Sequence, residues 1–315
     1  MFGTNLAGAK LLKKMNYKEF FNCKYPIIAA TMNQVSDLKL AIACHDAGIL
    51  PSLSVYNYSL ANSNVNLEAL ENDIKQFQDI TGTSDVLISI AKGHFLTPKF
   101  LELSLKLNIK FIEALLDDPP YMDVDINLFW EYKRNNIKII PKIFGSLGII
   151  KNVDAVILKG SNGAGRGLSY IDTDSQLDTI IETYPSMPVI MSGGIGTSQD
   201  INRYLSKGCM AVAIGTLFAA SEESSISKET KLKLVEASSS NITQLSNGAQ
   251  QNALIFKEID KNLDDFNNTL SLVNGIKNPT TGHVFAGTSI DNITAIRPMK
   301  DIVQELIQNL DNFIV

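Results

Sequence analysis

Glycine clusters follow three short apolar runs in the second half of the chain. The run and the glycine segment that follows it are residues 153–158 with 159–167, 188–191 with 192–196, and 211–214 with 215–216. Glycine at the carboxyl end of a strand lets backbone N–H groups approach an anion closely. The spacing therefore predicts a phosphate-bearing ligand at Gly193, Gly194 and Gly215, with a hydroxyl donor from Thr216. The alternative is that these glycines only form tight turns.

Candidate acid–base groups are few, because the chain holds three histidines. His94 follows an apolar run and is expected at the functional end of the fold. His45 falls within a helical pattern and is expected to be a surface or packing residue. His283 is expected in a loop that could reach the mouth of the site. The pair Asp117-Asp118 precedes two prolines, which favours a loop-capping role over catalysis.

Strand and helix patterns that could position these residues alternate along the chain. The expected strands are 25–30, 49–55, 86–90, 111–115, 137–144, 153–158, 189–191 and 211–214. The expected helices are 36–47, 67–81, 97–107 and 126–135, with a short helical turn at 146–151. Eight continuously apolar strands that alternate with helices predict a parallel sheet covered on both faces, and the number favours closure into a (β/α)8 TIM barrel. An open, doubly wound sheet is the alternative.

The character of the sequence changes after Ser221. Residues 224–272 are rich in Ser, Asn and Gln and have a helical tendency, whereas 298–313 again shows apolar residues at helical spacing. We expect a barrel over residues 1–221, a helical insertion or lid after strand eight over 222–285, and a return to the barrel with its last helix over 286–315.

Composition excludes several classes of protein. The chain has 315 residues, of which 45% are hydrophobic and 19% charged, with a formal net charge of −5. There is no basic patch that would favour nucleic acid. The three cysteines are far apart, which argues against a disulfide framework or a metal site and favours a reducing, cytoplasmic location. No membrane-spanning run or signal peptide is expected.

Ordered motifs from Tyr25 to Leu306 resemble one family of flavoproteins. The segments that carry the resemblance are Pro26–Met32, Ala47–Ser54, Asp154–Gly160, Pro188–Ile195, Ala213–Phe218, Ala220–Ser224 and Lys231–Ala237. They are similar to the strand ends and following helix of the nitronate monooxygenase (2-nitropropane dioxygenase-like) family. The resemblance implies a TIM barrel that holds FMN non-covalently at its carboxyl-terminal face. FAD is not expected, because no GxGxxG motif follows an early strand.

The resemblance also implies site residues beyond the glycine clusters. The expected cofactor-binding residues are Ala30, Thr31, Met32, Ser89, Lys159, Gly163, Gly165, Ser192, Gly193, Gly194, Gly215 and Thr216. Thr31 replaces the proline usual in the family. Lys159 could place its ammonium group near the N1–C2 edge of the flavin, where it would stabilise the anionic reduced form, or could face solvent. No residue is expected to bind a metal.

One departure from the family pattern lies in the loop after the sixth strand. The first eight positions of the family's Gly-x-Glu-Ala-Gly-Gly-His-x-Gly correspond to residues 160–167, where Asn162 falls at the glutamate position and Arg166 at the position of the histidine base. Arginine stays protonated at physiological pH and does not act as a general base. Arg166 could instead hold an anionic substrate.

These features predict an FMN-dependent oxidoreductase of the nitronate monooxygenase type, with Arg166, His94 and Lys159 as its catalytic candidates. Its partners would be a small, anionic organic substrate and oxygen or NAD(P)H, and a homodimer would be compatible with this function. One alternative is an NAD(P)H-dependent flavin reductase or enoyl-thioester reductase on the same barrel. The other is a protein that binds FMN or phosphate without turnover.

Overall fold

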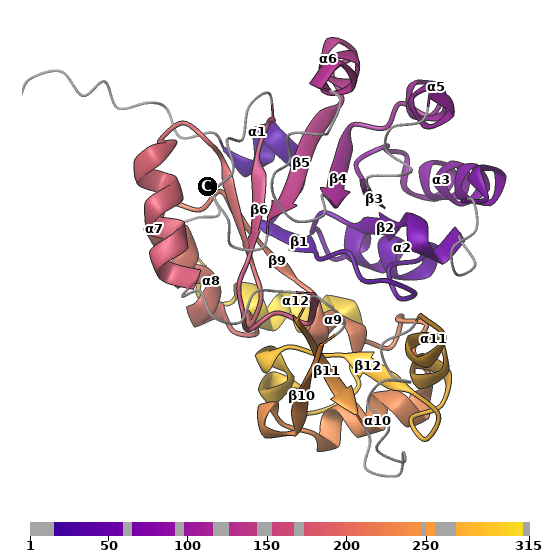
Figure 1. Cartoon of the computed structure of the whole chain (residues 1–315), viewed down its shortest axis with the longest axis vertical. Helices are drawn as coiled ribbons and strands as arrows, with labels where there is room; N and C mark the ends of the chain where they lie inside the picture. The colour runs from indigo at the N-terminus through magenta and orange to yellow at the C-terminus, as the bar shows by residue number, and fades with distance from the viewer. Residues whose placement is uncertain are drawn as a thin grey trace, which may run out of the picture.

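A computed structural model describes residues 16–58, 65–91, 98–115, 126–143, 153–166, 173–246, 250–255 and 269–310. Eight parallel strands form its main sheet, in the order β1-β9-β8-β6-β5-β4-β3-β2 (Figure 1). Ile28 and Leu50 form a parallel bridge, so that the two ends of this sheet meet. The TIM barrel predicted from the sequence is confirmed.

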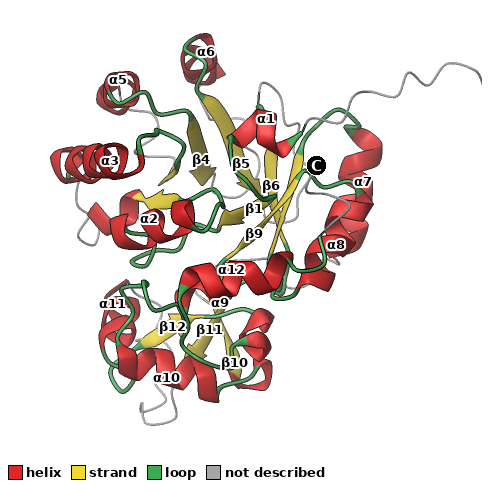
Figure 2. Ribbon diagram, turned by 180° about the vertical axis from the view of Figure 1, so that it is seen from behind, coloured by secondary structure: helices red, strands yellow, loops and turns green. Residues whose placement is uncertain are grey.

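All eight predicted strands are present, at bounds close to those expected. They are β1 (Ile27–Ala29), β2 (Ser52–Ser54), β3 (Leu87–Ala91), β4 (Phe111–Leu115), β5 (Lys138–Ile143), β6 (Val156–Lys159), β8 (Val189–Ser192) and β9 (Ala211–Ile214). The helices around them are α2 (Leu38–Asp46), α3 (Leu67–Thr81), α5 (Pro98–Lys106), α6 (Ile126–Arg134), α7 (Thr173–Thr183), α8 (Ser198–Lys207), α9 (Thr216–Ala219) and α12 (Met299–Ile307). Figure 2 shows these helices outside the strands.

The amino-terminal end of the barrel is closed by a short helix that the sequence analysis did not predict. Helix α1 (Tyr17–Phe21) buries Phe20 and Phe21 against Phe111 of β4, with centroids of the Phe21 and Phe111 rings 5.3 Å apart. The same apolar cluster contains Ile28 and Leu87 from the barrel interior. Because aromatic side chains fill this end, a ligand site must lie at the carboxyl ends of the strands, as in other barrels of this kind.

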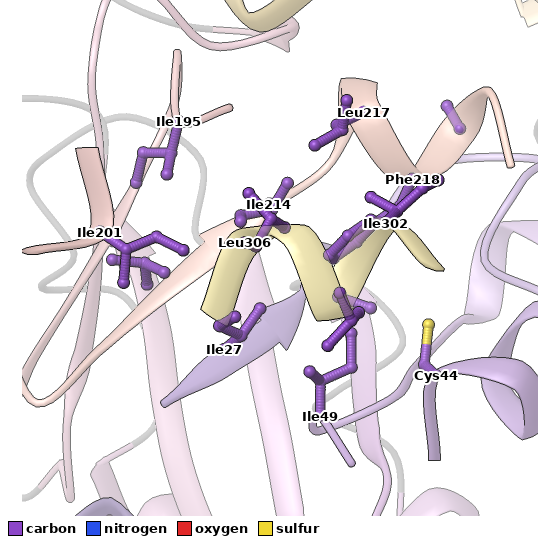
Figure 3. Packing of buried hydrophobic residues seen from close by; sticks show 14 of the residues in the cluster. Ile27, Cys44, Ile49, Ile195, Ile201, Ile214, Leu217, Phe218, Ile302 and Leu306 are labelled. Carbon is purple, nitrogen blue, oxygen red and sulfur yellow. The ribbon is translucent and has the colours of Figure 1, made fainter. Parts of the chain in front are cut away.

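The last helix, α12, packs against the barrel. Ile302 and Leu306 of α12 are buried in one cluster with Ile27 of β1 and Ile214 of β9, and Figure 3 shows these side chains together. Apolar residues at helical spacing make this packing face. Helix α12 therefore covers the outside of β1 and β9.

The insertion between β9 and α12 differs from the helical lid that we expected. It contains α10 (Lys228–Glu236) and α11 (Thr269–Lys277), but also the antiparallel strands β10 (Ile242–Ser246), β11 (Gln250–Ile255) and β12 (His283–Phe285). Figure 1 shows this unit at one end of the barrel. The sequence did not indicate these strands, because the small sheet is only partly buried and its strands therefore contain polar residues. Gln244 is exposed, whereas Ala253 is buried.

A further two-residue strand, β7 (Gly165–Arg166), joins the barrel to this unit. It leaves the carboxyl end of β6 and pairs antiparallel with β11, with Gly165 opposite Asn252 and Arg166 opposite Gln251. The insertion is thus hydrogen-bonded to the loop in which the family pattern changes. Within the described ranges, no helix has the length and apolar character needed to cross a membrane.

Candidate functional site

Four strand ends lie side by side at the carboxyl-terminal face because of the sheet order. Strands β1, β9, β8 and β6 are neighbours in the barrel. Lys159 is paired in register with Ser192, and the Ser192 carbonyl accepts the N–H of Gly160 at 2.9 Å. The Ala30 N–H donates to the carbonyl of Ile214 at 2.9 Å. Residues 30–32, 159–166, 192–194 and 215–216 therefore form one continuous rim.

Packing between two loops explains why glycine occupies three positions of this rim. A Cβ atom on Gly193, whose φ is +103°, would lie 3.0 Å from the backbone nitrogen of Gly163. A Cβ on Gly163 would lie 2.7 Å from Cε of Lys159. On Gly194, with φ +72°, it would lie 2.7 Å from Cβ of Asn162. Close packing of the two loops thus explains why these three positions are glycine. Whether an anion can also bind depends on whether the backbone N–H groups have other acceptors.

Backbone donors of the rim remain available to a ligand. Among the described residues, no hydrogen-bond acceptor takes the N–H of Gly193, Gly194 or Gly215. Three such donors on adjacent strand ends provide the kind of N–H group that binds phosphate oxygens.

The neighbouring helix terminus, by contrast, is already occupied. A single carboxylate oxygen of Asp200 accepts from the N–H groups of Gly196 and Thr197, each at 3.0 Å, in a capping box that starts α8. The amides of Gly196 and Thr197 are thus satisfied by the chain's own acid. These two amides are therefore not free for a phosphate, whereas, within the described part of the chain, those of Gly193 and Gly194 are.

The segment after β9 meets both the first strand and the end of the insertion. A Cβ on Gly215 would lie at ordinary contact distance, 3.6 Å, from Cβ of Ala30 and Sδ of Met32. The Thr216 hydroxyl is buried and accepts the Gly287 N–H at 3.0 Å, which leaves its own hydrogen to donate elsewhere. Met32, Gly215 and Thr216 are thus brought together as predicted from the order of the motifs.

A buried ionic cluster inside the barrel was missed in the sequence analysis. The Glu113 carboxylate is fully buried and accepts from the Ser89 hydroxyl at 2.9 Å, from Thr31 at 3.2 Å and from the Lys142 ammonium group at 2.7 Å. These residues come from β4, β3, the end of β1 and β5. The available signal was a charged residue in the interior of each of two apolar runs. Glu113 and Lys142 each lie two positions after a residue that faces the barrel interior, Phe111 and Ile140 respectively, and so lie on the same face of their strands.

Of the three catalytic candidates, the structure describes the side chain of Lys159 only. The Lys159 ammonium group donates to the carbonyl of Ala164, and so folds back over its own loop. The backbone of Arg166 lies in β7, and its side chain is outside what the structure describes. His94, like the Asp117-Asp118 pair, is also outside the described residues.

The other two histidines lie away from the rim. His45 is in α2, partly buried, with Nδ1 3.3 Å from the carboxylate of Asp46 and its ring against that of Phe77. His283 is not in a loop but in β12, where it is buried and its Nδ1 lies 3.0 Å from the Ser271 hydroxyl. Burial lowers the pKa of His283 to about 4. Its side chain belongs to the core of the insertion, because β12 packs against α11 there.

Comparison with known families settles the kinship of the chain. A model of the nitronate monooxygenase family matches residues 135–309, which is more than half of the chain and includes all three glycine segments and the insertion. The chain belongs to the nitronate monooxygenase family. Membership in this family makes it an oxidoreductase of this barrel group. Among the described residues, no cluster of His, Cys, Asp and Glu is suited to a metal ion.

Solved structures agree with the fold. FabK from Thermotoga maritima has a TM-score of 0.75 at 20% identity, with 94% of this chain and 96% of that chain covered. Nitroalkane oxidase from Streptomyces ansochromogenes has a TM-score of 0.73 at 18% identity, covering 94% and 98%. The enoyl reductase domain of MlnA from Bacillus amyloliquefaciens has a TM-score of 0.69 at 12% identity, covering 95% and 96%. At these identities the likeness concerns the fold.

Proposed function

We propose that the chain is an FMN-dependent oxidoreductase of the nitronate monooxygenase type that acts on a small, anionic organic substrate. The observation that carries this proposal is the rim of unused N–H donors at Gly193, Gly194 and Gly215, in a chain of this family. FMN, when bound, would accept electrons from the substrate and pass them to oxygen or another acceptor.

The residues present fit such a group. Gly193, Gly194 and Gly215, together with the Thr216 hydroxyl, would hold the phosphate through neutral donors. Ala30, Thr31 and Met32 lie on the adjoining strand end and would border the ring system. Ser192, Gly163 and Gly165 support the same rim, whereas Ser89 acts through Glu113.

Two lysines lie on neighbouring strands towards this face of the barrel. Lys159 is half-buried at the end of β6, and Lys142 is buried on β5 beside Glu113. Of these two, the ammonium group of Lys159 would stabilise an anionic ligand or a reduced flavin. Because Glu113 offsets the charge of Lys142, the interior carries this ion pair without a net charge.

Arg166 gives the substrate class. At the position of the family's histidine base, a permanently charged guanidinium group would bind an anion but would not remove a proton. A nitronate is already anionic and requires no proton abstraction, whereas a neutral nitroalkane does. The proposed substrate is therefore an anion of the nitronate or carboxylate kind.

Flavin binding tests the proposal directly. The purified chain should be yellow, or its apoprotein should quench FMN fluorescence on titration. Gly215→Asp should abolish this binding by placing a carboxylate beside the phosphate, while Gly215→Ala should retain it because its Cβ meets only ordinary contacts. Retention of FMN by Gly215→Asp would overturn the phosphate placement.

Turnover needs a separate measurement. We expect a nitronate to bleach the bound flavin under anaerobic conditions, and air to restore its colour. A flavin that is bleached only by NADH or NADPH would indicate the reductase alternative instead. A bound flavin that no donor bleaches would indicate a binding protein without turnover.

A further inference from the structure

Four consecutive backbone carbonyls of the loop after β6 are held by donors. Nδ2 of Asn252, on β11 of the insertion, donates to the carbonyls of Ser161 at 2.7 Å and Gly163 at 2.9 Å. The carbonyl between them, on Asn162, accepts the N–H of Thr288 at 3.0 Å. The next, on Ala164, accepts from Lys159. The loop thus takes its shape partly from residues about 90 positions further along the chain.

The orientation of the Asn252 amide is determined by its partners. Both loop atoms are carbonyl oxygens, which accept only, so the nitrogen of the amide must face them. Its oxygen faces the other way and accepts from Nε2 of Gln244, across the strand pair, at 3.4 Å. An aspartate at this position would have the same shape but would bring acceptors against two acceptors.

Two more contacts tie the same loop to the insertion. Gly165 pairs with Asn252 in the β7–β11 ladder, and its φ is +66°. A Cβ on Gly165 would be 3.4 Å from the ring of Phe285 on β12. The backbone of Arg166 is the next position of the ladder, opposite Gln251. The place of Arg166 is therefore set by the insertion sheet.

We propose that Asn252 is a positioning residue that holds the 160–166 loop in the conformation that completes the ligand site. The insertion is then a template for the site and not only a cover over it. This inference rests on the proposed function for the identity of the ligand. The role of Asn252 in shaping the loop is independent of the proposed function.

Hydrogen exchange of the apoprotein, followed by mass spectrometry, reports on the loop without any ligand. In Asn252→Asp and Asn252→Ala we expect the amides of 160–166 to exchange about tenfold faster, as the loss of two hydrogen bonds implies, with the larger effect for aspartate. Peptides from β3 (Leu87–Ala91) serve as the internal reference and should not change. Asn135→Ala is the matched control, because the exposed Asn135 also donates its Nδ2 to a backbone carbonyl, that of Glu131 in α6 at 2.8 Å, and contacts neither Asn252 nor the loop.

FMN affinity is the second readout. If the loop spends less time in its site-forming conformation, the apparent Kd for FMN should rise by a similar factor of about ten in the Asn252 variants, and not in Asn135→Ala. Unchanged exchange of 160–166 in both Asn252 variants would overturn the inference, and so would equally accelerated exchange in β3. A parent chain that binds no FMN, but whose loop opens in Asn252→Asp, would refute the proposed function and support the positioning role.

Discussion

Lys142 and Glu113 bring opposite charges into the interior of an otherwise apolar barrel. Their side chains are 8% and 0% exposed, and the ammonium nitrogen lies 2.7 Å from a carboxylate oxygen. Taking both charges out of water is costly, and their attraction offsets that cost only while both are present. Thr31 and Ser89 satisfy further lone pairs of Glu113. The cluster connects four strand ends around the site.

Removal of one partner should therefore be more harmful than removal of both. We expect Lys142→Met to lower the free energy of unfolding by about 3–5 kcal/mol, because it leaves the buried Glu113 uncompensated. The double variant Lys142→Met with Glu113→Gln should recover most of this loss. Urea unfolding of the parent, both single variants and the double variant gives the coupling energy. Equal loss in the single and double variants would contradict the pairing.

Arg166 carries a prediction about substrate charge. Arg166→Ala should lower kcat/KM for an anionic substrate about ten- to a hundredfold, as expected for the loss of one charge-assisted, bidentate contact of about 1.5–3 kcal/mol. Arg166→His should gain activity on neutral nitroalkanes relative to nitronates, because histidine can accept a proton near neutral pH. Steady-state kinetics with both substrate forms checks this.

The control for Arg166 is Arg203→Ala, an exposed arginine of α8 that is paired with Asp174. It should leave both substrates unaffected. If Arg166→Ala behaves like Arg203→Ala, the guanidinium group does not reach the site.

At the scale of elements, the start of α8 fixes the glycine turn after β8. Thr197 and Asp200 cap each other reciprocally, and the Asp200 carboxylate also accepts the N–H of Gly196. The turn at Gly193 and Gly194 is three residues upstream of this cap. The cap therefore connects the stability of a helix with the geometry of the proposed phosphate loop.

Thr197→Ala should lower the free energy of unfolding by about 1 kcal/mol, the usual cost of a lost N-cap, and should weaken FMN binding. Ser227→Ala is a matched control, because Ser227 caps α10 in the insertion by accepting the N–H of Thr230. Chemical denaturation and FMN titration of both variants distinguish the two effects. Equal FMN affinity in both would mean that the α8 cap does not act on the loop.

At the scale of the whole molecule, the insertion and the barrel meet at the candidate site. The β7–β11 ladder, the Gly287–Thr216 hydrogen bond and the Asn252 amide all cross between them. Loss of structure in the insertion should therefore also disturb the conformation of the rim. His283 provides a way to destabilise the insertion with pH.

Burial lowers the pKa of His283 from 6.5 to about 4 in the folded chain. Above pH 6.5 the residue is neutral in both the folded and the unfolded states, and its contribution to stability is complete. As the pH falls from 6.5 towards 4, the unfolded chain takes up the proton first, so stability decreases by up to about 3 kcal/mol.

Urea unfolding of the parent and of His283→Asn, at several values between pH 7 and pH 4, tests this dependence. The difference in unfolding free energy between the two should narrow steadily as the pH falls. His45→Asn, on α2, is the control for a histidine outside the insertion. A difference that stays constant over the whole range would contradict the prediction.

Local sequence patterns predicted the strands and several helices of the barrel but not the short helix that closes its amino-terminal end. The eight apolar runs and the span of α3 were predicted correctly, because strand and helix periodicity depends on residues close together in the sequence. The same patterns placed the glycine loops at one end of the barrel. Helix α1 was not predicted, because its five residues are too few to show a helical periodicity.

Only the tertiary structure decided which distant residues meet. Glu113 and Lys142 are charged residues inside apolar runs, and their pairing follows from the register of neighbouring strands. The strands of the insertion contain Gln and Asn and resemble loops until they pair. Asn252 reads as an ordinary polar residue, yet its amide shapes a loop about 90 positions away. Such contacts depend on how the chain closes in space, which local periodicity does not encode.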